Sequence, residues 1–125
     1  MKTIVLDTGA PIALERGNAK MRALCRAVLD SGHRFVVPVG VVGQAWRGSA
    51  RQHAVRTLLD DAHTAVAPLD RPLAEAAGIL CGMSRTSDVI DATVVLVARR
   101  EDAAVVTSDR GDLERLDPKL VAYEV

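Results

Sequence analysis

The sequence predicts a three-layer α/β domain, in which helices cover both faces of a central parallel β-sheet. Short runs of aliphatic residues alternate with longer helical patterns, and no hairpin turn separates any two of the runs. This order favours parallel strands joined by right-handed crossovers. Apolar residues make up 49% of the chain, with only one Phe, one Tyr and one Trp, so the core must be aliphatic.

Five short runs have the composition of buried strands. Their apolar residues occupy both faces, which is typical of a parallel sheet that helices cover on either side. The first run, Ile4-Val5-Leu6, is the one we expect in the middle of the sheet. The other four runs span residues 35–37, 64–67, 103–106 and 120–123.

Apolar residues at helical spacing fill the segments between these strands. Pro11 is expected in the first turn of a helix that ends at Gly17, and a second helix is expected from about residue 19 to 31. Gly78 and Gly82 predict irregularity in the fifth helix. The remaining helices are expected at about residues 39–46, 50–61, 73–83, 87–98 and around Leu113 and Leu116.

Length and composition limit the possible classes of protein. We expect one domain, residues 1–125, long enough to bury a core. Sixteen basic and sixteen acidic residues cancel, so any nucleic-acid contact would have to be local. No signal peptide or membrane span is evident, which predicts a cytoplasmic protein with no membrane partner. Cys25 and Cys81 are expected to be reduced, buried thiols.

Acidic residues cluster where the expected strands end and helices begin. Asp7 and Asp109 each stand at or just after the end of a strand. Because parallel strands share one carboxyl edge, where open α/β sheets bind ligands, these two acids can meet. Asp88 and Asp91 lie three residues apart at a helix start, and Asp109 and Asp112 repeat that spacing.

Each of these acids has an alternative explanation as a helix cap. Acidic side chains commonly accept hydrogen bonds from the first backbone N–H groups of a helix. For Asp88 and Asp112 capping is the better interpretation. The joint placement of Asp7, Asp91 and Asp109 favours a shared site instead.

A shared carboxylate site requires a cation. Two carboxylates about 4 Å apart repel by roughly 4 kcal/mol at an effective dielectric of about 20. Either one stays protonated or a divalent metal neutralises them, and ligands that are all oxygen suit Mg²⁺ or Mn²⁺ rather than zinc. Such an ion can bind a phosphate and activate a water molecule. His33, His53 and His63 are scattered, and no Ser-His-Asp or Cys-His nucleophile is evident.

Four blocks of sequence carry a family resemblance across nearly the whole chain. They are Val5-Leu6-Asp7-Thr8, Val37-Pro38 with Gln44-Ala45-Trp46-Arg47-Gly48, Asp88-Val89-Ile90-Asp91-Ala92, and Val106-Thr107-Ser108-Asp109 with Asp112-Leu113. In this order they resemble the PIN-domain ribonucleases, specifically the VapC-type toxins of bacterial toxin–antitoxin pairs. The resemblance implies a PIN-like sheet, a Mg²⁺-dependent endonuclease acting on RNA, a homodimer, and a VapB-type antitoxin that occludes the site.

The same resemblance implies roles for individual residues. Asp7, Asp91 and Asp109 match the acids that bind the metal and carry catalysis. Accessory roles are implied for two further acids, one amide and the two hydroxyls that support the acids, namely Asp88, Asp112, Gln44, Thr8 and Ser108.

Gln44 departs from the family pattern, which usually has a glutamate at this place before the Trp-Arg-Gly block. Glutamine keeps an acceptor oxygen but carries no charge, which predicts weaker metal binding. Asp88 could supply the missing charge. Two hypotheses follow: a nuclease that holds Mg²⁺ or Mn²⁺ weakly, or a PIN domain that binds RNA or an antitoxin without cutting.

Two surfaces could contact partners. Arg47 and Arg51 could bind RNA phosphates, although solvated helix faces carry such residues routinely. The apolar face with Met21, Leu24 and Val28 is expected in the core, and the resemblance adds an antitoxin groove or dimer interface as another use.

A protease hypothesis rests on Asp7-Thr8-Gly9, which matches the active-site tripeptide of retroviral-type aspartic proteases. Those enzymes are almost entirely β. Here Pro11 and a helical pattern follow the tripeptide, which argues against this class.

Overall fold

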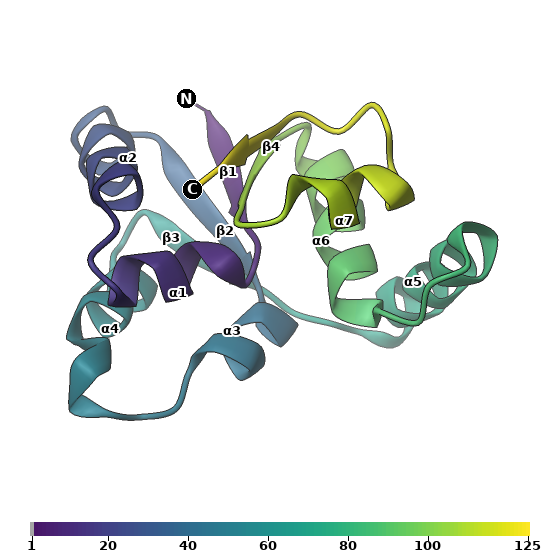
Figure 1. Cartoon of the computed structure of the whole chain (residues 1–125), viewed down its shortest axis with the longest axis horizontal. Helices are drawn as coiled ribbons and strands as arrows, with labels where there is room; N and C mark the ends of the chain where they lie inside the picture. The colour runs from purple at the N-terminus through teal and green to yellow at the C-terminus, as the bar shows by residue number, and fades with distance from the viewer. Residues whose placement is uncertain (1) are drawn as a thin grey trace.

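The computed structural model of this chain describes residues 2–125, and its five strands form one sheet in which every neighbouring pair is parallel (Figure 1). The strands are β1 (Thr3–Leu6), β2 (Arg34–Pro38), β3 (Thr64–Ala67), β4 (Ala104–Thr107) and β5 (Ala122–Glu124). Their order is β3-β2-β1-β4-β5, so β1 is central, as the sequence predicts. Met1, counted in the expected domain of residues 1–125, lies outside the described residues.

Helices cover both faces of this sheet, which confirms the three-layer α/β class. They are α1 (Gly9–Glu15), α2 (Ala19–Asp30), α3 (Val39–Ala45), the 3-10 turn η1 (Ala50–Gln52), α4 (His53–Asp60), α5 (Arg71–Ser84), α6 (Val89–Glu101) and α7 (Arg110–Leu116). One face packs against α1, α2 and α4, and the other against α6 (Figure 1). Helices α5 and α7 pack against α6. No helix within residues 2–125 is long and apolar enough to cross a membrane.

Several element boundaries differ from those predicted. The helix expected at residues 50–61 begins with the 3-10 turn η1 and becomes α-helical only at His53. Pro11 lies in the first turn of α1, as predicted, but that helix ends at Glu15 rather than Gly17. Gly78 and Gly82 do not interrupt α5, because Asp70 caps its start and α6 supports it along one side. Strand β5 begins at residue 122 rather than 120.

The core is aliphatic, as the composition requires. The central strands contribute Val5, Leu6, Val105 and Val106, each fully buried between the two helical layers. Met21 and Val28 of α2 are also buried, so that helix face is used for core packing. The thiols of Cys25 and Cys81 are free, the first partly buried and the second buried.

Glycines allow two close approaches at the carboxyl edge of the sheet. A Cβ atom on Gly9 would lie 2.5 Å from the Cβ of Ser108 and 2.8 Å from its backbone nitrogen. A Cβ on Gly40 would overlap the end of the Ile90 side chain, so α3 packs closely on the first turn of α6. Both contacts bring helices against the segments that carry the acidic residues.

A substitution pair tests the close approach at Gly9. Gly9→Ala should lower the free energy of unfolding by about 1–3 kcal/mol, because the segment after β4 must move away. Gly78→Ala should raise it by about 0.5–1 kcal/mol, since its Cβ meets nothing within 4 Å. Urea denaturation measures both. Equal effects of the two substitutions would contradict the packing described here.

Candidate active site

Asp7 is a buried carboxylate at the end of the central strand. Its side chain is only 8% exposed. One oxygen accepts a hydrogen bond from the backbone N–H of Thr8, and the other accepts one from the hydroxyl of Thr107, each at 2.8 Å. Thr8 is the N-cap of α1, so Asp7 does not serve as that helix's cap. Burial raises the pKa of Asp7; the two hydrogen bonds lower it in part, and Asp88 and Asp112 raise it further.

Thr107 is the site residue that the sequence analysis missed. It is fully buried at the end of β4, where its hydroxyl donates to Asp7 and accepts the N–H of Asp109 at 3.0 Å. Strand register explains its position, because Leu6 pairs with Val106 and Asp7 therefore faces the next residue along. The pairing of β1 with β4 is the signal that could have identified Thr107. The sequence alone does not reveal that these two strands are neighbours.

The two hydroxyls proposed as supports have other contacts. The Thr8 hydroxyl donates a hydrogen bond to the side-chain oxygen of Gln44. The Ser108 side chain lies against Gly9. Within residues 2–125 neither hydroxyl hydrogen-bonds to an acidic side chain. Gln44 is thus brought to the site beside Asp7, but its acceptor oxygen is engaged by Thr8.

Asp88 and Asp91 occupy the first turn of α6. The Asp88 carboxylate accepts the Asp91 N–H at 2.9 Å and is the N-cap, as predicted. Burial raises the pKa of Asp91 to about 7, and the negative charges of Asp7, Asp88 and Asp112 add to this shift. The structure therefore brings Asp7 and Asp91, which are 84 positions apart in the chain (91 minus 7), into one electrostatic environment.

The cap of α7 is Asp109 rather than Asp112. The metal-binding and catalytic role expected for Asp109 stays a prediction. Asp109 is the N-cap of α7 and accepts the Asp112 N–H at 3.2 Å, whereas capping was the interpretation preferred for Asp112. The charge of Asp112 raises the pKa of both Asp7 and Asp91. The Thr107 hydroxyl links Asp109 to Asp7, because it bonds to both residues.

The donor atoms at this edge suit a hard divalent cation, although they do not form a complete ligand set. Among residues 2–125 no three or more His, Cys, Asp or Glu side chains are placed to hold a metal ion together. Burial raises the pKa of both Asp7 and Asp91, and nearby acidic charges raise both further, so a cation at this edge would favour their ionised forms. Magnesium commonly binds through one or two carboxylates with water and substrate phosphates. The pair Asp7 and Asp91 fits that mode.

The arginines proposed to bind RNA lie beyond α3. The Arg47 guanidinium donates to the carbonyls of Gly43 and Trp46, at 3.1 and 2.8 Å, and so closes the end of that helix. The side-chain oxygen of the buried Gln52 accepts the N–H of Arg47. Arg51 is exposed on η1. A role of Arg47 or Arg51 in RNA binding stays a prediction.

Comparison with known families decides the classification. The PIN domain family matches residues 4–119. The chain belongs to the PIN-domain family. No curated protein matches this chain. The parallel, helix-covered sheet of this PIN domain also excludes the all-β protease hypothesis.

Solved structures share the PIN fold along almost the whole chain. VapBC2 from Rickettsia felis, solved with a DNA fragment from its promoter, is 12% identical, with 98% of both chains covered and a TM-score of 0.71. FitAcB from Neisseria gonorrhoeae is 17% identical. The match covers 97% of this chain and 96% of the FitAcB chain, with a TM-score of 0.63. A protein from Pyrobaculum aerophilum is 19% identical, with coverage of 97% and 89% and a TM-score of 0.62. At these identities the similarity shows the fold.

The pKa values predict how the stability of this PIN domain depends on pH. Because the pKa of Asp91 is about 7 in the folded state and 3.8 ordinarily, its stabilising effect is complete below pH 4 and is lost by about pH 7. The raised pKa of Asp7 acts in the same direction. The melting temperature in metal-free buffer should therefore fall more steeply between pH 4 and 7 than in Asp91→Asn.

The exposed Asp30 provides the matched control. Asp30→Asn should keep the pH dependence of the unmodified protein. The same slope in all three proteins would show that Asp91 ionises normally.

Proposed function

We propose that this PIN domain is a Mg²⁺-dependent endoribonuclease that acts as the toxin of a VapC-type toxin–antitoxin pair. The observation that carries the proposal is the placement of two acids at the carboxyl edge of the sheet: Asp7 follows the end of β1, and Asp91 lies in the first turn of α6, the helix that packs on β1. An RNA phosphodiester is the substrate class that such a site fits, because its phosphate can share a cation with the carboxylates.

Each residue has a distinct part in this proposal. Asp7, Asp91 and Asp109 would hold the cation, and Asp88 and Asp112 would add negative charge around it. Thr107 fixes the orientation of the Asp7 carboxylate, and Asp109 keeps α7 in place beside it. When bound, Mg²⁺ supplies charge neutralisation at the phosphate and a water molecule of lowered pKa. Mn²⁺ can replace it, since both take oxygen ligands.

A PIN domain that binds RNA or an antitoxin without cutting is the second candidate. The observation that favours it is the contact between Thr8 and Gln44, which occupies the glutamine's oxygen. Gln44 then adds neither a charge nor a free acceptor to the site. The two candidates differ in whether the protein turns over RNA in the presence of metal.

A VapB-type antitoxin and a second copy of the chain are the protein partners we propose. VapBC2 and FitAB, which share the fold, were each solved with DNA fragments. Large apolar side chains are exposed on α5, where Ile79 is 66% and Met83 is 78% accessible, and these suit a homodimer contact. An RNA substrate and such an antitoxin imply a cytoplasmic location.

Asp7→Asn is the direct test of the proposed activity. It should reduce RNA cleavage in Mg²⁺ by about a hundredfold or more, because a metal-binding charge is lost from a buried position. Circular dichroism should show an unchanged fold, and the melting temperature in metal-free buffer should not fall. Asp30→Asn is the control and should cleave normally. Cleavage by Asp7→Asn at the unmodified rate would disprove the metal-site assignment.

Gln44→Glu tests the role of the missing charge. An added carboxylate beside Thr8 should tighten Mg²⁺ binding by about tenfold, since it attracts the ion across a partly buried site. Calorimetric titration of both proteins with Mg²⁺ and with Mn²⁺ measures the change. If the two proteins bind each metal equally well, residue 44 does not face the cation.

A further inference from the structure

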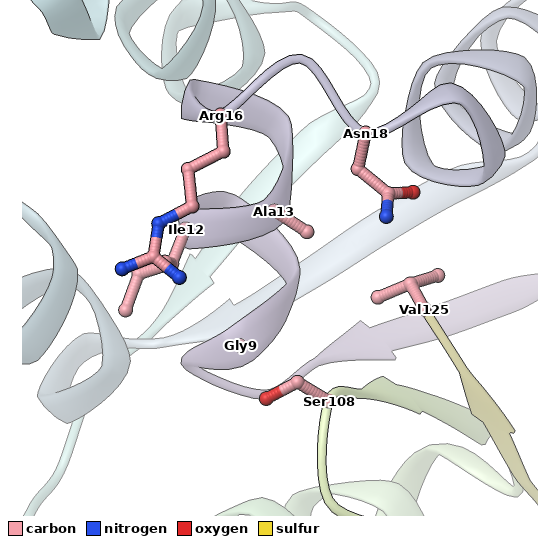
Figure 2. A pocket seen from close by; sticks show the side chains of 7 residues that line it. All are labelled: Gly9, Ile12, Ala13, Arg16, Asn18, Ser108 and Val125. Atoms are coloured by element: carbon pink, nitrogen blue, oxygen red, sulfur yellow. The ribbon is translucent and has the colours of Figure 1, made fainter.

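A groove runs along one side of α1, next to the candidate active site. Gly9, Ile12 and Ala13 form one wall, together with Arg16 just beyond the end of the helix (Figure 2). Ser108 and Val125, which follow β4 and β5, form the facing wall. Its volume is about 460 Å³, within the range of about 300–1,000 Å³ typical of small-ligand sites. We call it the α1 groove.

One end of the α1 groove lies next to the segments that carry the acidic residues. Gly9 and Ser108 lie in this end, one residue from Thr8 and Asp109 respectively. Because Gly9 has no side chain, Ser108 can lie directly against the start of α1. The groove therefore ends beside the two chain segments that carry Asp7 and Asp109.

The other end of the α1 groove is positively charged. The Arg16 side chain is exposed and makes no side-chain hydrogen bond or ion pair within residues 2–125. The guanidinium of Arg22 lies near the residue after Arg16, 3.6 Å from the position of a Cβ on Gly17, but it does not line the groove. Seven residues at a rise of 1.5 Å separate Gly9 from Arg16, or about 10 Å along the helix. The Arg16 side chain turns back along the helix, so its guanidinium lies beside Ile12 (Figure 2). An anion bound there would lie closer to Gly9 than this spacing.

The walls between these ends combine apolar and hydrogen-bonding surface. Ile12, Ala13 and Val125 offer contacts for a ribose or the face of a base. Asn18 uses its side-chain oxygen to cap α2, accepting the Met21 N–H at 2.9 Å, which leaves its amide nitrogen as a donor.

We propose that the α1 groove binds the ribonucleotide next to the phosphodiester that is cut, and that Arg16 contacts the following phosphate. This inference rests on the proposed function and assigns part of its substrate site. An RNA strand fits both ends, because one of its phosphates can share a cation with Asp7 and Asp91 while the next pairs with a guanidinium. A protein segment carries no such regular row of anions.

Binding measured without turnover tests this proposal separately from the nuclease activity. The probe is a fluorescein-labelled RNA dodecamer of randomised sequence, titrated with Asp7→Asn protein in Mg²⁺ at several salt concentrations. Adding Arg16→Ala should weaken binding about fivefold and reduce the salt slope by about 0.7, the loss of one phosphate contact on a single strand. Arg16→Lys should recover most of the affinity.

Two further variants separate charge from shape. Lys119→Ala removes one positive charge at the opposite edge of the sheet and should leave the affinity unchanged. Ala13→Leu fills the α1 groove without changing its charge, so it should weaken binding with an unchanged salt slope. Melting temperatures confirm that each variant folds. A DNA dodecamer of the same length should bind less tightly if the groove contacts the 2′-hydroxyl.

The possible results separate a failure of the groove assignment from a failure of the proposed nuclease activity. If the protein cleaves no RNA but Arg16→Ala still weakens RNA binding, the proposed function fails and the groove assignment stands. If Arg16→Ala and Lys119→Ala bind RNA alike, or if the protein binds no RNA, the groove assignment is overturned. A protein segment is then its remaining occupant.

Discussion

The hydrogen bond between Thr107 and Asp7 is the interaction on which the site depends. A buried carboxylate without partners costs several kcal/mol, so Asp7 can end the central strand only where donors meet both of its oxygens. The backbone of Thr8 supplies one donor and the hydroxyl of Thr107 the other. Because Thr107 also accepts the Asp109 N–H, one hydroxyl joins the ends of β1 and β4 to the start of α7.

The acidic cluster stores unfavourable free energy that the rest of the fold must offset. Each charge at Asp88 or Asp112 makes it harder for Asp7 and Asp91 to ionise. The offset comes from the aliphatic core beneath, where Val94, Val95 and Val97 of α6 are fully buried. The helix that places Asp91 at the site is thus also the helix that covers one face of the sheet. Carboxyl groups whose pKa is raised by burial and by neighbouring charges are typical of functional sites.

The sequence predicted the layers of the fold and most of its elements, because these depend on local patterns. Apolar runs identified all five strands, and cap residues such as Asp88 marked helix starts. The site was predicted less completely, because side-chain partnership depends on register and rotamers. The two acids Asp109 and Asp112 share a spacing that fits either role, and only the structure assigns the cap to Asp109. Thr107 was not predicted as a site residue, because threonine is common in strands and its place at the end of a strand needs no further explanation.

The strand order has a consequence for how the molecule is made. Asp7 and Thr107 are 100 residues apart, yet β1 and β4 are neighbours in the sheet. At a synthesis rate of about 5–20 residues per second, a ribosome needs several seconds to pass from one to the other. During that interval the nascent chain carries Asp7 without the partner that orients it. Whatever chemistry this edge performs is therefore withheld from the translating ribosome until the fourth strand has emerged and paired with the first.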